Sequence, residues 1–325
     1  MGYKNYIIRR VIYIIPLFVG ISILNFAMMH MAGDPVRLMT LGNPSLNIDL
    51  VRDQLRAYYG LDQPIYVQYG VWLWRFLHLD LGTSFYSGLS VNTIIGLYAW
   101  ETIKLQLVAL ILALVIGVPI GIYSATKQYS KFDITVTSSA ILGISIPIFY
   151  MGIIFILIFS FYLGWFPSFG AHSLQEIRYP FGSYFLDELW HLVLPSIAIA
   201  WVSMALYTRI VRSSMLEVLR QDYVLAARAS GLNERTIVFK HALRNAAIPL
   251  VTYVGIYIGL LLAGAPMTET VFTWPGLGYL YVTAVTKLDF PVIMGVNMLI
   301  TLIILAVNLI TDLIYGVIDP RIRYE

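Results

Sequence analysis

Six long apolar runs constrain this 325-residue chain more than any other feature of its sequence. They lie at approximately residues 10–31, 104–125, 134–163, 189–208, 247–266 and 290–317. A helix needs about 20 residues to cross the hydrocarbon core of a bilayer, and each run is long enough. Helices satisfy all of their own backbone hydrogen bonds inside lipid. The sequence therefore predicts an all-α integral membrane protein with six transmembrane helices.

The composition supports this fold class. Only 12% of the residues are charged, whereas soluble proteins carry about 25%. So few charged side chains cannot cover a globule of this size in water. The chain has no cysteine, which excludes disulfides, thiolate metal ligands and a cysteine nucleophile.

Two of the runs are unusually long, and the N-terminal run resembles a signal peptide in part. The runs at 134–163 and 290–317 exceed the length of a perpendicular helix, so we expect tilt or kinks there. Residues 1–31 combine a basic start with an apolar stretch that is long for a signal peptide. We expect them to form an N-terminal tail and an uncleaved first transmembrane helix.

The distribution of basic residues predicts the orientation. With the N-terminus inside, 14 of the 21 Lys and Arg residues fall in the segments expected to be cytoplasmic. Four of the other seven lie in the long first loop, where the positive-inside rule has little weight. Both termini are therefore predicted to be cytoplasmic.

The runs divide the rest of the chain into three further parts. Residues 32–103 form an extracellular loop or cap, residues 104–317 a five-helix core, and residues 318–325 a cytoplasmic tail. The core includes a cytoplasmic loop at 209–246 and an external loop at 267–289. The external loop holds an apolar, turn-rich stretch that can dip back into the protein. At membrane depth such irregular backbone is tolerated only when it is buried in protein or lines a cavity.

The loop at 209–246 contains a short helix that is stopped by a glycine. Residues Tyr223 to Ser230 are predicted to be helical, and Gly231 is placed to end that helix in the left-handed conformation. Asn233 can then cap a second helix that begins at Glu234. The sequence predicts a helix, a sharp turn and a helix.

Small side chains mark the first of these helices. Ala226, Ala227 and Ala229 allow a partner to approach closely, while Arg220 and Arg228 offer charged contacts at the rim. The alternative is an amphipathic helix that lies on anionic lipid. The alanines bury little apolar area, which favours a protein partner.

Two glycine pairs indicate close helix contacts. Gly117 and Gly121, like Gly255 and Gly259, stand four residues apart in apolar runs. Such pairs let two helices approach, either within one bundle or at the seam between two chains.

The loop at 209–246 resembles the coupling loop of ABC-importer permeases, whose general pattern is Glu-Ala-Ala, three residues, then Gly. Ala226, Ala227 and Gly231 match this pattern, while Leu225 replaces the glutamate. Two neighbouring stretches, Ala227-Arg-Ala-Ser-Gly-Leu232 and His241-Ala-Leu-Arg-Asn-Ala-Ala-Ile-Pro249, are similar to the oligopeptide, dipeptide and nickel branch of the family.

Further motifs resemble that branch in the same order along nearly the whole chain. They are Gly33-Asp-Pro35, Gly60-Leu-Asp-Gln-Pro64, Asp80-Leu-Gly82, Phe272-Thr-Trp-Pro-Gly-Leu-Gly278, Asp289-Phe-Pro-Val-Ile293 and Asp319-Pro-Arg-Ile-Arg323. The long loop after the first helix is similar to that of the first permease subunit in the dipeptide and oligopeptide systems.

The resemblance implies an ABC type I importer permease fold and a set of partners. A second homologous permease, two cytoplasmic ATPase subunits and an extracellular substrate-binding protein would complete the transporter in a prokaryotic cell membrane. The coupling helix would dock on an ATPase. The residues that match it are Asp222, Tyr223, Ala226, Ala227, Arg228 and Gly231.

The chain itself carries no sign of catalysis. It has no Gly-Lys dipeptide, and therefore no Walker A phosphate loop, so ATP and magnesium would bind in the partner subunits. The sequence shows no metal-ligand spacing and no pair of a nucleophile and a base. We therefore predict neither an enzyme nor a directly bound cofactor.

The predicted cargo follows from the same resemblance. Peptide is the predicted cargo, with oligosaccharide as the alternative. We expect Ser145, Pro147, Tyr257 and Asn297 to line the translocation path. A self-contained secondary transporter usually needs acidic residues in mid-membrane, and an intramembrane enzyme needs facing catalytic groups. Neither pattern is visible, which favours a conduit moved by partners.

Overall fold

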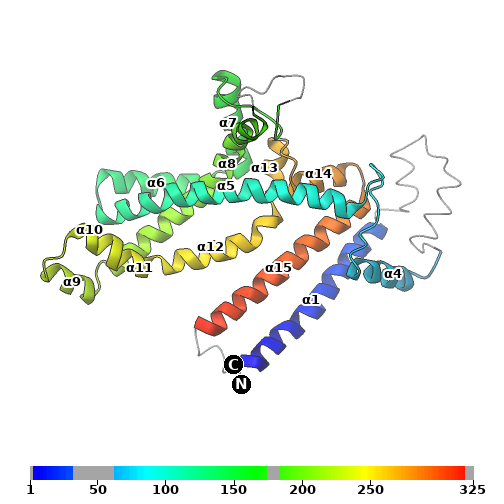
Figure 1. The fold of residues 1–325 in the computed structure, drawn as a ribbon, viewed down its shortest axis with the longest axis horizontal. Helices are drawn as coiled ribbons and strands as arrows, with labels where there is room; N and C mark the ends of the chain where they lie inside the picture. The colour runs from blue at the N-terminus through cyan, green and yellow to red at the C-terminus, as the bar shows by residue number, and fades with distance from the viewer. Residues whose placement is uncertain (1–2, 32–61, 174–182, 319–325) are drawn as a thin grey trace. The chain divides into compact units, whose positions relative to one another are not determined.

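The computed structural model describes residues 3–31, 62–173 and 183–318. It divides into two compact units, residues 1–101 with 276–325 (unit 1) and residues 102–275 (unit 2). Residues 32–61 of the predicted cap at 32–103 and residues 319–325 of the predicted tail lie outside the described residues. The described residues are almost entirely helical (Figure 1).

Four helices are long and apolar enough to cross a membrane. They are α1 (Tyr3–Met31), α5 (Val91–Thr126), α8 (Tyr184–Val218) and α15 (Phe290–Ile318). Two bent helix pairs raise the number of spans to six if each pair counts as one. Each predicted run falls on one of these six. The boundaries differ, since α5 and α8 are much longer than the runs that predicted them.

The first bent pair corresponds to the run at 134–163. Helix α6 (Lys131–Ser145) is followed by α7 (Ile148–Phe155) and a π-helix, η1 (Ile156–Tyr162), with a bend of 102° between them. Ile146 and Pro147 at the break have extended ψ angles of 127° and 135°. A proline disfavours helical backbone at the residue before it, so the expected kink is confirmed here.

The second bent pair begins in the predicted loop. It comprises α10 (Glu234–Thr236), the π-helix η2 (Ile237–Ala242), α11 (Leu243–Ala246) and α12 (Ile248–Leu260). The bend before α12 is 51°. Pro249 lies in the first turn of α12, where its missing N–H is tolerated but the preceding helix cannot continue undisturbed.

In unit 1, α1 and α15 run side by side (Figure 1). Asn25 joins them, because its amide donates to the Met294 carbonyl and accepts from the Asn297 amide, both at 3.3 Å. Helix α4 (Ile65–Leu77) packs on α1, and α14 (Leu277–Thr286) packs on α15. Over Phe290–Ile318, α15 has no break.

A buried carboxylate organises the turn before α5 in the same unit. Asp289 is 4% exposed and accepts from the Ser84 hydroxyl at 2.5 Å and the Phe85 amide at 2.9 Å. The backbone of Thr83 pairs with Ser90 in an isolated bridge. These contacts fix residues 83–90 against the start of α15.

In unit 2, two glycines allow α5 to pack closely against α8. A Cβ atom added to Gly117 would lie 2.9 Å from the Met204 carbonyl oxygen, and one added to Gly121 would lie 2.7 Å from that of Thr208. The Thr208 hydroxyl donates to the Gly117 carbonyl at 3.0 Å. This glycine pair therefore serves packing within one chain. At Gly255 an added Cβ meets nothing within 4 Å.

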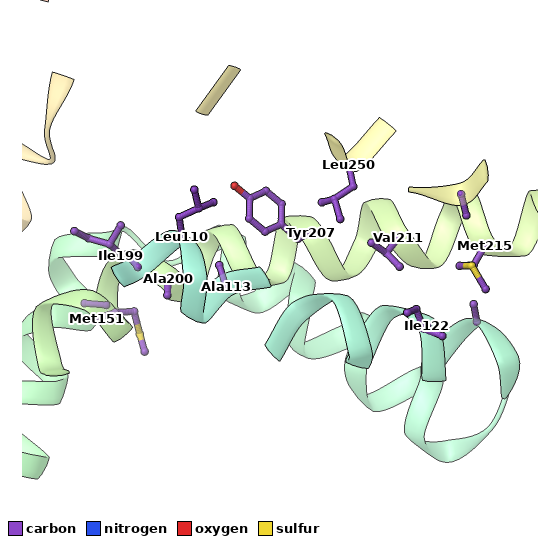
Figure 2. Close-up of a cluster of buried hydrophobic side chains, with 14 of the residues drawn as sticks. Leu110, Ala113, Ile122, Met151, Ile199, Ala200, Tyr207, Val211, Met215 and Leu250 are labelled. Atoms are coloured by element: carbon purple, nitrogen blue, oxygen red, sulfur yellow. The ribbon is translucent and has the colours of Figure 1, made fainter. Parts of the chain in front are cut away.

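The core of unit 2 is one cluster of apolar side chains centred on α8. In Figure 2, Val211 and Met215 of α8 lie close to Ile122 of α5. Helix α13 (Pro266–Val271), which follows the short 3₁₀-helix η3 (Leu261–Ala263), leads into Phe272 and Trp274. Both aromatic side chains belong to the cluster, and Trp274 is fully buried. The start of the 267–289 loop therefore does dip into the protein.

Candidate functional site

The predicted helix and glycine turn are present in unit 2. Helix α9 spans Asp222–Ala229, and Gly231 follows it with φ of 76°. The Gly231 amide donates to the Arg228 carbonyl at 2.9 Å, and the Leu232 amide to the Ala227 carbonyl at 3.3 Å. This pair of bonds is the Schellman motif, in which a left-handed residue satisfies the last carbonyls of a helix.

The second helix begins as predicted. The side-chain oxygen of Asn233 accepts from the Arg235 amide at 2.9 Å and caps α10. The chain then continues through η2 to Ala246. We call the whole stretch from Asp222 to Ala246 the α9–α11 unit.

Buried apolar residues attach the α9–α11 unit to the core. Val224 of α9 and Ile237 of η2 are both fully buried, as is Met215 near the end of α8. All three belong to the same apolar cluster. The unit is therefore fixed to α8 from its inner side.

Its outer side is open. Asp222, Tyr223, Ala226, Arg228 and Gly231 are exposed. The predicted small surface is correct for Ala226 and Ala229. Ala227, by contrast, is half-buried and packs against the apolar cluster. Leu225, which stands where the general pattern has glutamate, is 51% exposed.

Polar contacts close the unit on itself. The Asn245 amide donates to the Tyr223 hydroxyl at 2.7 Å and so ties α11 to α9. The Arg228 guanidinium donates to the Glu234 carboxylate at 2.6 Å across the turn. The second pair is solvent-exposed on both sides, and such pairs add little stability.

A buried ion pair next to this unit was missed by the sequence analysis. Arg212 of α8 donates from Nε and Nη2 to the two carboxylate oxygens of Asp133, at 2.5 and 2.8 Å. Ser124 of α5 and the Tyr129 amide, at 2.9 Å, also donate to this carboxylate. The Ser130 hydroxyl accepts from the Asp133 amide at 3.2 Å. In the sequence, Ser130 and Asp133 form a Ser-x-x-Asp capping pattern. This pattern predicts the start of a helix, but it does not identify Arg212 as the partner of Asp133.

A second carboxylate in unit 2 was also missed. Glu269 of α13 is fully buried and accepts from the Thr102 hydroxyl at 3.2 Å and the Ala265 amide at 3.3 Å. It lies in the loop that sequence reasoning marked only as apolar.

The predicted path residues lie in both units. In unit 2, the Ser145 hydroxyl donates to the Ile141 carbonyl at 2.9 Å, and Pro147 immediately precedes α7. The Tyr257 hydroxyl donates to Gln106 at 2.7 Å. Asn297, in unit 1, contacts Asn25. Their role in a path stays a prediction.

Comparison with known protein families defines the class of protein. Residues 117–324 match the family described as the binding-protein-dependent transport system inner membrane component. The chain belongs to this family and is a multi-pass membrane protein. The type I importer permease fold implied by the sequence is thereby confirmed.

Two relatives place the chain more narrowly. The oligopeptide transport system permease protein AppB of Bacillus subtilis is 42% identical over 98% of this chain and 99% of the relative. The dipeptide transport system permease protein DppB of Escherichia coli K12 is 39% identical over 99% of both chains. The resemblance to the oligopeptide and dipeptide branch is thus confirmed.

A solved structure is also matched. The MetNI methionine ABC transporter in inward-facing conformations matches 67% of this chain and 94% of its own, with a TM-score of 0.49 and 21% identity.

Proposed function

We propose that this chain is the permease subunit of an ATP-driven importer and forms half of a translocation pathway for peptides. The observation that carries the proposal is its similarity to two permeases named for peptide transport, at 42% and 39% identity over nearly full length. The same similarity disfavours oligosaccharide as the cargo.

The α9–α11 unit is the site that receives the ATPase. Its inner residues Val224 and Ile237 are fully buried in the core, so the unit moves with α8 as one body. Its outer surface presents exposed small and apolar side chains beside the charged side chains of Asp222 and Arg228, which suits a cleft on a partner. The coupling residues are Asp222, Tyr223, Ala226, Ala227, Arg228 and Gly231.

The remaining machinery lies in other chains. A second homologous permease completes the pathway, two cytoplasmic ATPase subunits bind ATP and magnesium, and an extracellular binding protein delivers peptide. Delivery falls to the loops at 32–103 and 267–289. This arrangement requires that both termini and the loop at 209–246 lie in the cytoplasm, as the basic residues predict.

The path inside the membrane is lined by polar and proline positions on several helices. Ser145, Pro147, Tyr257 and Asn297 are the assigned residues. Ser145 and Pro147 are exposed in the structure, and Tyr257 is half-buried.

Reconstitution tests this function directly. The complete complex in proteoliposomes, supplied with binding protein and labelled tri-alanine, is expected to accumulate peptide only when ATP is present. Maltotriose is not expected to be accumulated or to compete. Uptake of tri-alanine by the permeases alone, driven by an ion gradient, would instead identify a secondary transporter.

A further inference from the structure

The proposed function assigns no role to the ion pair between Asp133 and Arg212. Asp133 is 2% exposed and lies in the first turn of α6, while the Arg212 side chain is 23% exposed on α8. Two parallel N–H to oxygen bonds join them, and this forked geometry fixes direction as well as distance. The pair therefore holds the α5–α6 turn to α8 in one register.

The ion pair stands immediately before the α9–α11 unit. Helix α8 continues past Arg212 to Val218, and three intervening residues separate it from the start of α9. Arg220 in this connection donates to Gln128 of the α5–α6 turn at 3.3 Å. Two polar contacts thus tie the turn to the last part of α8.

Packing also constrains this place. Gly121 of α5 closely approaches Thr208 and Val211 of α8, which limits sliding of α5 on α8. The apolar neighbours of α8 here include Ile122 and Ala125 of α5, and apolar attraction by itself has no preferred direction. The forked ion pair resists sliding as well. A buried charge pair adds little net stability compared with apolar residues of the same size, but it can specify one arrangement.

We propose that Asp133 and Arg212 are positioning residues that pass the movement of the α9–α11 unit to the α5–α6 hairpin. The proposal rests on the proposed function, in which an ATPase moves that unit. Movement of α9 carries the end of α8 with it through Met215 and Val224. The ion pair then obliges α6, and with it the bent span that follows, to move in step.

The test uses the complete complex in proteoliposomes with labelled tri-alanine. Asp133→Asn and Arg212→Gln are each expected to retain ATP hydrolysis while the peptide imported per ATP falls about tenfold, within the usual range of coupling between sites. Because both variants remove the same link, combining them is expected to cost no more than either alone. Arg212→Lys keeps the charge without the fork and is expected to fall between wild type and Arg212→Gln.

Ser124→Ala is the matched control. It removes a donor to the same carboxylate from within the α5–α6 hairpin and leaves the link to α8 intact. Its peptide-to-ATP ratio is expected to equal that of the wild type. An equal loss in Ser124→Ala, or a normal ratio in Asp133→Asn, would overturn the proposal.

A second variant guards against simple misfolding. Leucine at both positions replaces the charges with apolar groups, which buried sites usually accept. The double variant is expected to assemble with its partners and still be uncoupled. An assembled double variant with a wild-type ratio contradicts the proposal.

A measurement on the permease complex separates this inference from the proposed function. The chain has no cysteine, so spin labels can be attached uniquely at Lys127→Cys and Leu225→Cys. The distribution of distances between the two spin labels is expected to be narrow in the otherwise wild-type complex. It is expected to be broader when the complex also carries Asp133→Asn. Broadening in a complex that imports no tri-alanine keeps the inference and rejects the peptide cargo. Unchanged distances in a complex that imports peptide reject the inference alone.

Discussion

The side-chain amide of Asn245 donates to the hydroxyl of Tyr223 at 2.7 Å, across 22 residues of chain. The contact joins the last helix of the α9–α11 unit to the first. Together with the Gly231 turn it closes the unit into a ring of local contacts. The surface that we propose as the docking site of the ATPase is therefore held in shape by contacts within this chain.

Removal of this hydrogen bond tests that closure. Tyr223→Phe keeps the ring and loses the hydroxyl, at a cost of about 0.5–1.5 kcal/mol for one hydrogen bond. We expect faster hydrogen–deuterium exchange in residues 222–232 and little change in the midpoint of thermal unfolding. The same result is expected for Asn245→Ala. Unchanged exchange in both variants would show that the bond does not hold α9.

Gly231→Val tests the turn. Gly231 has φ of 76°, and nothing lies within 4 Å of an added Cβ atom. The penalty is therefore conformational, about 1–2 kcal/mol for an ordinary residue in the left-handed region. We expect membrane insertion to be kept and ATP hydrolysis to become uncoupled from uptake. Gly231→Asn is the control, because asparagine tolerates this backbone conformation, and it is expected to stay coupled. Normal ATP-driven uptake by Gly231→Val would contradict the assignment of Gly231 as a coupling residue.

Added bulk on α9 should act differently at two neighbouring alanines. Ala226 is exposed, so Ala226→Trp is expected to block docking of the ATPase and leave the stability of the permease unchanged. Ala227 packs against the core, so Ala227→Trp is expected to uncouple uptake and also lower the midpoint of thermal unfolding. Co-purification of the ATPase and a thermal scan in detergent measure the two effects. Full ATPase binding by Ala226→Trp contradicts the assigned docking surface.

A matched pair of glycine substitutions tests the seat between α5 and α8. Gly121→Ala places a Cβ atom 2.7 Å from the Thr208 carbonyl oxygen, whereas Gly255→Ala meets nothing. Overpacking of this kind costs about 1–3 kcal/mol. We expect a lower thermal midpoint for Gly121→Ala and no decrease for Gly255→Ala. Equal midpoints would mean that α5 and α8 do not approach this closely.

The buried carboxylate of unit 1 gives a test in residues outside the α9–α11 unit. Asp289→Asn turns one acceptor oxygen into a donor that faces the donors Ser84 and Phe85. A buried group left without its bond costs about 1–3 kcal/mol. The exposed Asp80 bonds the Gly82 amide, so Asp80→Asn is the control. Thermal midpoints in detergent should fall clearly for Asp289→Asn only.

Local patterns carried most of the fold prediction. The apolar runs located all six spans because crossing a bilayer imposes a length and an apolar composition on each segment separately. Pro147 marked a break because proline restricts the residue just before it. Boundaries were less accurate, since α5 begins at Val91 and α8 continues to Val218. Apolar residues at those ends, Val91 and Val218 among them, pack into the protein. Polar residues stand between them, so these ends do not belong to a continuous apolar run.

The sequence by itself determined the helix, glycine turn and capped helix of the α9–α11 unit, because each of these depends on residues within a few positions of one another. Only the tertiary structure decided that Ala227 turns inward. It alone paired Asp133 with Arg212, which lie 79 residues apart. The physical reason is that a buried charge takes as its partner whichever group the packed helices bring within reach, and that choice is made by the fold.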